Sequence, residues 1–150
     1  LMNFAEERLA DVLGEITPLL IDHWHHIALD KDRVPLAPAW DLYRDLDEQG
    51  SMKIITAREG GELVGYIVYL LSPSLHYTSQ FFAEGDIFWL SPAHRKGSAG
   101  LRLFRFAETI LKDAGVTKVI NKVKLHADVG KVFEHMGYSP IERVYAKAIS

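Results

Sequence analysis

The sequence EGDIFWLSPAHRKGSAGLRLFRFA, residues 84–107, carries the pattern from which the fold is predicted. An apolar strand leads to a turn at Pro92, a basic loop of small residues follows, and an amphipathic helix comes last. At such a junction the free backbone N–H groups lie at the positive end of the helix, which favours binding of an anion. The common phosphate loops GxxxxGK(S/T) and GxGxxG are both absent. We therefore predict an anion site at this loop, which contains Arg95, Lys96, Gly97, Ser98, Ala99 and Gly100.

Composition limits the classes of protein to which the chain can belong. Its 150 residues, of which 48% are apolar and 25% charged, predict one globular domain over residues 1–150. The absence of cysteine excludes disulfides, thiolate metal sites and a cysteine nucleophile, and is typical of a cytoplasmic protein. The net charge of −3 counts against a nucleic-acid partner, and no apolar run is long enough to predict a membrane span.

The segments before this stretch predict two helices followed by strands. Pro18 interrupts the first helix, so we expect a kink or a break near Thr17. Gly60-Gly61 between two β-rich runs predicts a hairpin. The predicted elements are an edge strand Met2–Glu7, a helix Arg8–Leu29, a loop Asp30–Pro38, a helix Ala39–Gln49, and strands Met52–Glu59, Glu62–Leu71 and Ser79–Leu90.

The segments after the loop predict helices alternating with strands. In the first helix the spacing of apolar residues puts Leu101, Phe104, Ala107, Leu111 and Ala114 on the inner face. The predicted elements are a helix Ser98–Ala114, a strand Thr117–Leu125, a helix Asp128–Met136, and a terminal antiparallel pair Tyr138–Glu142 and Arg143–Ile149.

The basic loop resembles the acyl-CoA pyrophosphate loop of the GNAT superfamily of N-acetyltransferases. Arg95 and Gly100 match the family pattern, while Ser98 stands where glycine is usual. Phe133, Gly137 and Tyr138 are similar to the close of that family's last helix. The resemblance implies an α+β fold over nearly the whole chain. Its mixed, mostly antiparallel sheet of six to seven strands would be splayed at the cofactor site and flanked by four helices.

The same resemblance implies acetyl-CoA as co-substrate and no metal. Backbone groups of Phe88, Trp89 and Leu90 would bind the pantetheine arm, and the Leu90 N–H is the candidate for polarising the thioester carbonyl. We expect the Ser98 hydroxyl to cap the following helix and bind phosphate.

Transfer to an amine also needs a general base. Strand alternation places Glu84, Asp86, Phe88 and Leu90 on one face of their strand. A carboxylate enclosed among apolar residues is suited to accept a proton, so Asp86 is the first candidate and Glu84 the second. The competing interpretation for each is a carboxylate bonded to a neighbouring backbone group or histidine.

A general acid for the departing thiolate is missing at its usual place. Many relatives have tyrosine where this chain has Phe133, which cannot donate a proton. Tyr138, Tyr145 or His126 could substitute, or the thiolate could leave unprotonated. His126 follows the strand predicted to end at Leu125, where the family often has an asparagine near the pantetheine.

For the acceptor site we expect polar aromatic side chains around the mouth: His23, Trp24, His76 and Tyr77. The cluster of histidines at 23–26 lacks a nearby third ligand, which counts against a metal. These residues, with LDKD at 29–32, resemble a group of GNAT proteins from phages and bacteria whose acceptor is undefined.

The sequence thus predicts an N-acetyltransferase that acts on a small-molecule amine or a protein, as a possible homodimer. A silent acyl-CoA sensor and a toxin acetylating charged tRNA are the alternatives. Arg102, Arg105, Lys122 and Lys124 would form the basic strip that the toxin requires.

Overall fold

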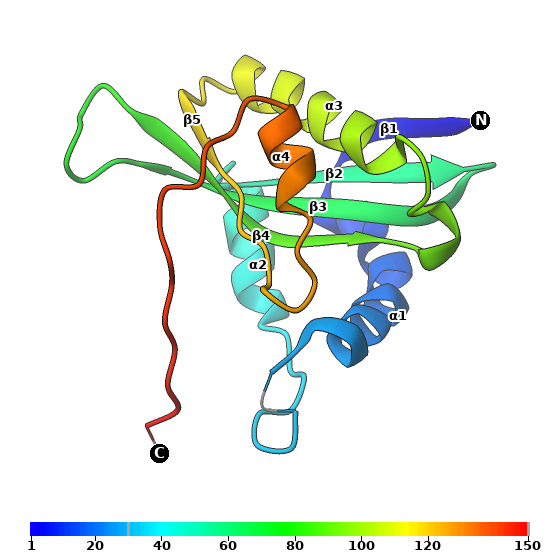
Figure 1. Cartoon of the computed structure of the whole chain (residues 1–150). Coiled ribbons are helices and arrows are strands. Elements are labelled where there is room, and N and C mark those ends of the chain that lie inside the picture. The colour runs from blue at the N-terminus through cyan, green and yellow to red at the C-terminus, as the bar shows by residue number, and fades with distance from the viewer. Residues whose placement is uncertain (30, 150) are drawn as a thin grey trace.

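The computed structural model describes residues 1–29 and 31–149, which form one five-stranded sheet with helices on both faces (Figure 1). The predicted loop from Asp30 to Pro38 begins at a residue outside this description. In chain order the elements are β1 (Met2–Glu7), α1 (Leu9–Ile27), α2 (Trp40–Glu48), β2 (Met52–Glu59), β3 (Glu62–Pro73), β4 (Phe81–Leu90), a 3₁₀ turn (Pro92–His94), α3 (Ala99–Asp113), β5 (Lys118–Ile120) and α4 (Gly130–His135).

The sheet follows the order of the strands in the chain. β1, β2, β3 and β4 are antiparallel to their neighbours, and β5 joins β4 in parallel. The predicted hairpin at Gly60-Gly61 is confirmed, since both glycines have positive φ angles of 58° and 85° between β2 and β3. The fold is therefore α+β with a mixed sheet, as predicted.

The prediction of six to seven strands is wrong for the described residues, which contain five. The predicted pair Tyr138–Glu142 and Arg143–Ile149 does not form, and the chain after α4 instead runs away from the sheet in extended form (Figure 1). A strand is stable only when its backbone groups find a partner. The pattern of residues predicted strands but could not show whether this chain supplies their partner.

Two apolar layers hold the helices on the sheet. On one face α1 and α2 cover a core that includes Val12, Ile54, Tyr66 and Trp89. On the other face α3 and α4 cover a core centred on residues such as Ile67. The α3 residues that are buried in it differ slightly from the prediction, because Leu103 replaces Leu101 at the contact: Ala99, Leu103, Phe104, Ala107 and Leu111.

The first helix is continuous, so the predicted break at Pro18 is absent from α1. Proline at this position removes one backbone hydrogen bond, while the apolar face of α1 remains packed on both sides of it through Ile16 and Leu20. In the described part of the chain, none of the helices has the length and apolar character that a membrane crossing requires.

Strand β5 is much shorter than predicted, and this shapes the site. The prediction ran from Thr117 to Leu125, whereas β5 ends at Ile120. Its pairing with β4 covers three residue pairs and ends at Glu84 and Ile120, while β4 continues to Leu90. The second half of β4 therefore extends beyond its pairing with β5, and we call this open part of its edge the splay.

Candidate functional site

The basic loop joins the end of β4 to the N-terminus of α3. Residues 95–98 are exposed, and Gly97 has a φ angle of 83°, a left-handed conformation that favours glycine. A Cβ atom added at Gly97 or Gly100 would meet nothing within 4 Å. The loop is thus open to solvent, and its small residues leave room for a ligand to approach the backbone at the positive end of a helix.

Arg95 folds back from this loop onto the end of β4. Its Nε donates a hydrogen bond of 2.6 Å to the carbonyl oxygen of Leu90. The guanidinium is therefore held beside the strand end as well as beside the loop. Lys96 is exposed next to it and adds a second positive charge.

Ser98 occupies the N-cap position of α3, as expected, but its side chain makes no capping hydrogen bond. Its Oγ instead accepts a hydrogen bond of 3.2 Å from Nε of Arg102, one turn into the helix. The expected cap is therefore wrong, because the backbone of Ser98, with φ −99° and ψ 5°, is not in the extended conformation that directs a capping side chain toward the helix N-terminus.

The direction of the Leu90 N–H follows from the ladder between β3 and β4. The backbone N–H of Ser91 donates to the Val64 carbonyl at 2.8 Å, so it points toward β3. Because neighbouring residues of a strand direct their N–H groups to opposite edges, the Leu90 N–H points to the edge where β5 has already ended. This N–H is available to a ligand in the splay.

The strand face predicted for Asp86 is interrupted by a β-bulge. Val68 pairs with Ile87 and Tyr69 pairs with Gly85, which leaves Asp86 as an additional residue in β4. Asp86 lies on the α2 face, where its Oδ2 accepts a hydrogen bond of 2.8 Å from the Tyr43 hydroxyl.

Beyond the bulge the alternation of β4 is reversed. Phe88 packs against Phe104 of α3, with 4.6 Å between ring centroids, on the opposite face of the sheet from Asp86. The prediction that Asp86 and Phe88 share a face is therefore wrong, because one inserted residue changes the direction of every side chain after it. Asp86 is also exposed, contrary to the prediction that it is enclosed.

Glu84, the second candidate base, forms an ion pair. Its Oε2 lies 3.2 Å from Nζ of Lys122, and both side chains are about half exposed. Glu84 is also the last residue of β4 that pairs with β5. Within the described chain neither carboxylate is bonded to a backbone group or a histidine, as the competing interpretation expected: Glu84 pairs with Lys122, and Asp86 accepts from the neutral phenol of Tyr43.

Asn121 was missed by the sequence analysis, which extended the strand to Leu125 and so examined His126. Asn121 follows the last residue of β5 directly, and its Oδ1 accepts a hydrogen bond of 2.7 Å from the Tyr69 hydroxyl. Its Nδ2 is buried and has no hydrogen-bond partner within the described residues. A buried amide donor without a partner is costly, which makes Asn121 a candidate contact for a ligand; the neighbouring polar group is the Tyr138 hydroxyl, whose pKa is raised by burial and lowered less strongly by the Asn121 side chain.

The residues that could act as the acid lie in three different environments. Phe133 is buried and packs on Phe104 at 4.8 Å and on Tyr138 at 5.5 Å between ring centroids. Tyr138 donates a 2.9 Å hydrogen bond to Oε2 of Glu108, and burial together with this contact raises the pKa of Tyr138. His126 and Tyr145 are both exposed.

The four expected acceptor residues are divided between two regions. His23 is buried near the end of α1, and burial, together with the charges of Arg95, His26 and Lys124, lowers the pKa of His23 to about 4. Trp24 is partly buried beside it. His76 and Tyr77 are exposed on the loop between β3 and β4.

Strand β4 keeps these two regions apart. It starts after the loop that holds His76 and ends at Leu90, and its ten residues span about 30 Å. Of the four expected acceptor residues, His23 is close enough to Arg95 for the charge of the arginine to lower its pKa. His23 therefore lies near the end of β4 that is followed by the basic loop.

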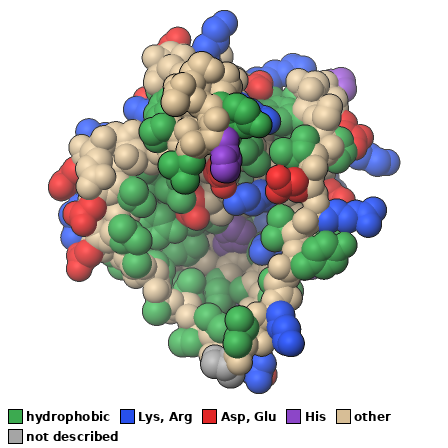
Figure 2. Space-filling model, turned by 90° about the vertical axis from the view of Figure 1, so that its left-hand side faces the viewer, with side chains coloured by type: hydrophobic (Ala, Val, Ile, Leu, Met, Phe, Trp, Pro, Cys, Tyr) green, Lys and Arg blue, Asp and Glu red, His purple; other side chains and the backbone are tan. Residues whose placement is uncertain are grey.

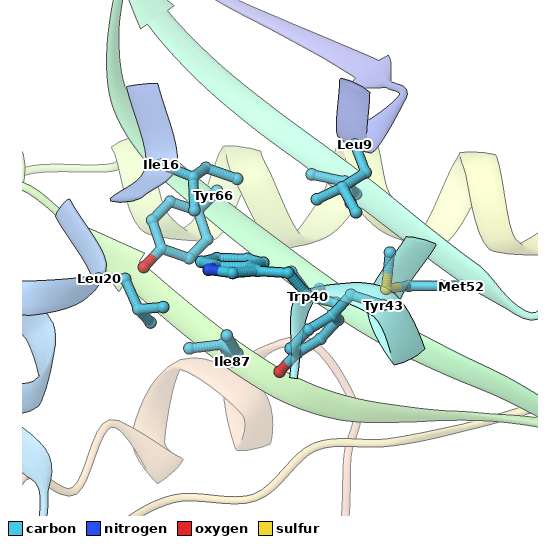
Figure 3. Close-up of a pocket in the computed structure, with 10 residues that line it drawn as sticks. Leu9, Ile16, Leu20, Trp40, Tyr43, Met52, Tyr66 and Ile87 are labelled. Atoms are coloured by element: carbon cyan, nitrogen blue, oxygen red, sulfur yellow. The ribbon is translucent and has the colours of Figure 1, made fainter. Parts of the chain in front are cut away.

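Aromatic residues on the α1 and α2 face hold Tyr43 in place. A small apolar cavity of about 20 Å³ lies between these helices and the sheet, and Figure 3 shows Trp40 across it with Tyr66 and Tyr43 on either side. Trp40 and Tyr43 pack with 5.8 Å between ring centroids. The hydroxyl of Tyr66 is buried without a partner in the described chain. This packing directs the Tyr43 hydroxyl toward β4, beside Ile87 (Figure 3).

Charged groups gather around a hollow on one side of the molecule. Figure 2 shows basic, acidic and histidine side chains around this hollow, with apolar side chains beside them. Such a mixture suits a ligand that has a charged group and an apolar part.

Comparison with known proteins identifies what this arrangement resembles. The sequence model of the family described as "Acetyltransferase (GNAT) family" matches residues 17–138. No curated protein has a matching sequence.

Solved structures of acetyltransferases share the fold at low sequence identity. A ribosomal-protein-alanine N-acetyltransferase from Brucella melitensis biovar Abortus 2308 is 18% identical, with a TM-score of 0.74 and complete coverage of both chains. An aminoglycoside acetyltransferase from an uncultured soil metagenomic sample is 13% identical, with a TM-score of 0.76 over 100% of this chain and 99% of the other.

A third structure was determined with acetyl-CoA. It is a predicted acetyltransferase from Clostridium acetobutylicum, 12% identical, with a TM-score of 0.69 over 99% of this chain and 96% of that chain. At such identities these likenesses show the fold alone.

Proposed function

The chain belongs to the GNAT acetyltransferase family, which makes it an acyltransferase, and we propose that it transfers the acetyl group of acetyl-CoA directly to a primary amine. The amine is carried by a small molecule or a protein. The observation that supports this most directly is the splay. β4 continues past its last pair with β5, and the Leu90 N–H points into the space beside the basic loop.

The residues around the splay fit acetyl-CoA. The loop from Arg95 to Gly100 offers two positive side chains and open backbone at a helix N-terminus for the pyrophosphate. Backbone groups of Phe88, Trp89 and Leu90 are suited to the amides of the pantetheine arm. The buried Nδ2 of Asn121 is a further donor for that arm, since it has no partner within the described chain.

Bound acetyl-CoA supplies an acyl group activated as a thioester. The Leu90 N–H would hold the thioester carbonyl and stabilise the negative charge that develops on its oxygen. The fixed position of Leu90 supports this role, because its own carbonyl is held by Arg95 at 2.6 Å and its strand is paired with β3.

We assign the role of general base to Asp86, with Glu84 as the alternative. An alkyl amine with a reference pKa of about 10.4 is protonated at neutral pH and must lose a proton before it attacks. Asp86 is exposed at the bulge, so an incoming amine can reach it directly or through a water. Tyr43 acts as a positioning residue, since its hydroxyl fixes one oxygen of that carboxylate.

The departing thiolate has no donor at Phe133. Tyr138 is the aromatic hydroxyl next to that ring, but its proton is directed to Glu108. His126 and Tyr145 remain exposed alternatives. We therefore propose that the thiolate leaves unprotonated and takes its proton from solvent.

The acceptor is bound on the side of the sheet where α1 and α2 lie. His23 and Trp24 belong to this side, whereas His76 and Tyr77 could contact only an acceptor that extends to the far end of β4. A single domain over residues 1–150 and a cytoplasmic location are parts of the same proposal, the latter supported by the absence of cysteine.

Calorimetry with acetyl-CoA tests the proposal at its first step. We expect binding, and a rise of the melting temperature with ligand concentration. Arg95→Glu should weaken binding by about 1–3 kcal/mol, the range for hydrogen bonds to charged groups. Lys112→Glu is the matched control, because Lys112 is exposed at the other end of α3. Absence of binding by the unaltered chain would overturn the proposal.

A silent acyl-CoA sensor is the second candidate, and Phe133 in place of an acid favours it. Thioester consumption with a broad panel of small amines, peptides and proteins separates the two functions. The enzyme consumes acetyl-CoA only when an amine acceptor is present, whereas the sensor binds without turnover. A toxin that acetylates charged tRNA would stop translation on expression, but Lys122 of its basic strip is already paired with Glu84.

A further inference from the structure

Two hydrogen-bond donors are buried on the α1 and α2 face of the sheet without a partner in the described chain. They are the hydroxyl of Tyr66 and Nε1 of Trp89. The two side chains are 0% and 4% exposed, and both belong to the core beneath these helices. A buried donor that makes no hydrogen bond is costly, so two of them in one place indicate a group that the folded chain does not itself supply.

The position of the two donors connects the proposed base with the end of β4. Tyr66 on β3 is paired with Trp89 on β4, and their stacked rings have 6.2 Å between centroids. Along β4, Trp89 stands between Asp86 and Leu90, whose N–H points into the splay. Tyr66 lines the cavity beneath α1 and α2 together with Tyr43, which holds Asp86 (Figure 3). The donors are therefore on the face of the sheet that the acceptor is proposed to use.

From these observations we infer that the Tyr66 hydroxyl and Nε1 of Trp89 bind an oxygen atom of the acceptor and so determine which amines are used. The acceptor is then a primary amine whose neighbouring carbon carries a carbonyl or carboxylate group. This inference rests on the proposed acetyl transfer, to which it adds the chemical class of the acceptor and the two residues that select it.

The chemistry of the two donors requires an oxygen of this kind. The indole N–H of tryptophan can donate a hydrogen bond but cannot accept one. Burial raises the pKa of Tyr66, so its hydroxyl keeps its proton at neutral pH and is also able to donate. A carbonyl or carboxylate oxygen has two lone pairs and can accept both bonds, whereas an alkyl group would leave both donors unpaired.

The spacing along β4 places this oxygen close to the reacting amine. Neighbouring residues of a strand are about 3.3 Å apart, and Trp89 comes directly before Leu90. The amine must lie beside the thioester carbonyl that the Leu90 N–H holds. An oxygen at the indole and an amine at the thioester are thus separated by only a few bonds, as in an α-amino acid or its amide.

Access to the two donors requires a movement of α2. The cavity beside Tyr66 has a volume of about 20 Å³, which is room for about one water-sized group. Trp40 lies across this cavity, and its helix has no buried residue of its own (Figure 3). A shift of α2 therefore opens the region to the acceptor while the ladder between β3 and β4 stays intact.

Matched amines test the class of the acceptor. For each of several amino acids, the free acid, its amide and the amine left after removal of the carboxyl group are offered with acetyl-CoA. Rates are compared per fraction of unprotonated amine, because the three compounds differ in the pKa of their amine. The kcat/KM for the acid or the amide should exceed that for the decarboxylated amine by about 100-fold or more, since the latter leaves both donors unpaired.

The outcomes of this panel separate the inference from the proposed function. A preference for the acid assigns a carboxylate, and a preference for the amide, or equal use of both, assigns a carbonyl oxygen; each of these results supports the inference. Equal turnover of all three compounds overturns the inference alone. Absence of turnover with every amine overturns the proposed function, and the inference with it.

Tyr66→Phe tests one donor without removing its ring. The preference for the acid or the amide over the decarboxylated amine should fall by about tenfold or more, and the affinity for acetyl-CoA should stay the same. The melting temperature should not decrease, because the lost hydroxyl has no partner in the described chain. Tyr69→Phe is the matched control for stability and should lower the melting temperature, since the Tyr69 hydroxyl donates to Asn121. A lower melting temperature in Tyr66→Phe with an unchanged preference among the three compounds shows a structural hydroxyl and overturns the inference.

Discussion

The hydroxyl of Tyr43 donates a hydrogen bond of 2.8 Å to Oδ2 of Asp86, and this contact joins α2 to the bulge in β4. α2 has no buried residue of its own, so its position depends on partly buried side chains such as Trp40 and Tyr43. Burial, with the contact to Asp86, raises the pKa of Tyr43, so the phenol keeps its proton at neutral pH and remains the donor.

Asp86→Asn should lower turnover by about 100-fold or more, the usual scale for a lost general base, without loss of acetyl-CoA binding. Asparagine keeps the size of the side chain but cannot take a proton from the acceptor amine. Steady-state rates and calorimetry on the same preparation provide the two measurements. Glu84→Gln is the control and should have a smaller effect, since Glu84 is paired with Lys122. The reverse order would move the base to Glu84.

Tyr43→Phe should reduce kcat by about fivefold, because Asp86 loses about 1 kcal/mol of hydrogen bonding that fixes its carboxylate. The ring, and with it the packing on Trp40, is retained. The melting temperature and the acetyl-CoA affinity should therefore change little. A purely structural role predicts the opposite result, with a lower melting temperature and an unchanged kcat.

The hairpin, the basic loop and the helix after it could be predicted because their signals are local. Gly60-Gly61 sets the turn between β2 and β3, and the predicted strand Met52–Glu59 has the observed bounds. The loop at Arg95 likewise precedes an apolar helical face that begins within one residue of the predicted start. In these places neighbouring residues alone decide the conformation.

The bulge at Asp86 could not be predicted, because it depends on register between two strands. The predicted alternation of side chains between the two faces of β4 is correct up to Gly85. The additional residue is revealed only by the pairing of Tyr69 with Gly85 and of Val68 with Ile87. Gly85 was nevertheless a signal. A glycine inside a strand often marks a bulge, and Gly85 lies directly before the additional residue.

The end of β5 depends on long-range pairing in the same way. β-rich residues continue after Ile120, but they form a strand only where a partner is present. A strand that continued to Leu125 would place His126 directly after its end, whereas the observed end at Ile120 places Asn121 there. The contact of Tyr43 with Asp86 was not predicted either. The sequence predicts the helix that contains Tyr43, but not which of its side chains point toward β4.

Gly65→Ala should disturb the site through Leu90. The two residues are opposite one another in the sheet, and a Cβ atom at Gly65 would lie 2.7 Å from Cδ1 of Leu90 and 3.0 Å from the Trp89 carbonyl oxygen. We expect a loss of about 1–3 kcal/mol in the free energy of unfolding, from overpacking, together with weaker acetyl-CoA binding. Chemical denaturation and calorimetry measure the two effects.

Gly14→Ala is the matched control for that substitution. Gly14 lies inside α1, and a Cβ atom there meets nothing within 4 Å. Alanine at this position should stabilise the protein by about 0.5–1 kcal/mol, because glycine is a poor helix former. If Gly65→Ala behaves like Gly14→Ala, the close contact with Leu90 does not constrain the strand.

His23 should make the stability depend on pH between 4 and 6.5. Its pKa is lowered from 6.5 to about 4 in the folded chain, so over this range the unfolded state binds more protons and acid favours unfolding. The contribution of His23 to stability is almost complete above pH 6.5 and decreases as the pH falls toward 4, by about 1.6 kcal/mol between pH 6.5 and 5. Denaturation at several pH values measures the slope. His23→Gln should flatten it, whereas His76→Gln, at an exposed position, should leave it unchanged. An equal slope in His23→Gln would show that other groups carry the acid sensitivity.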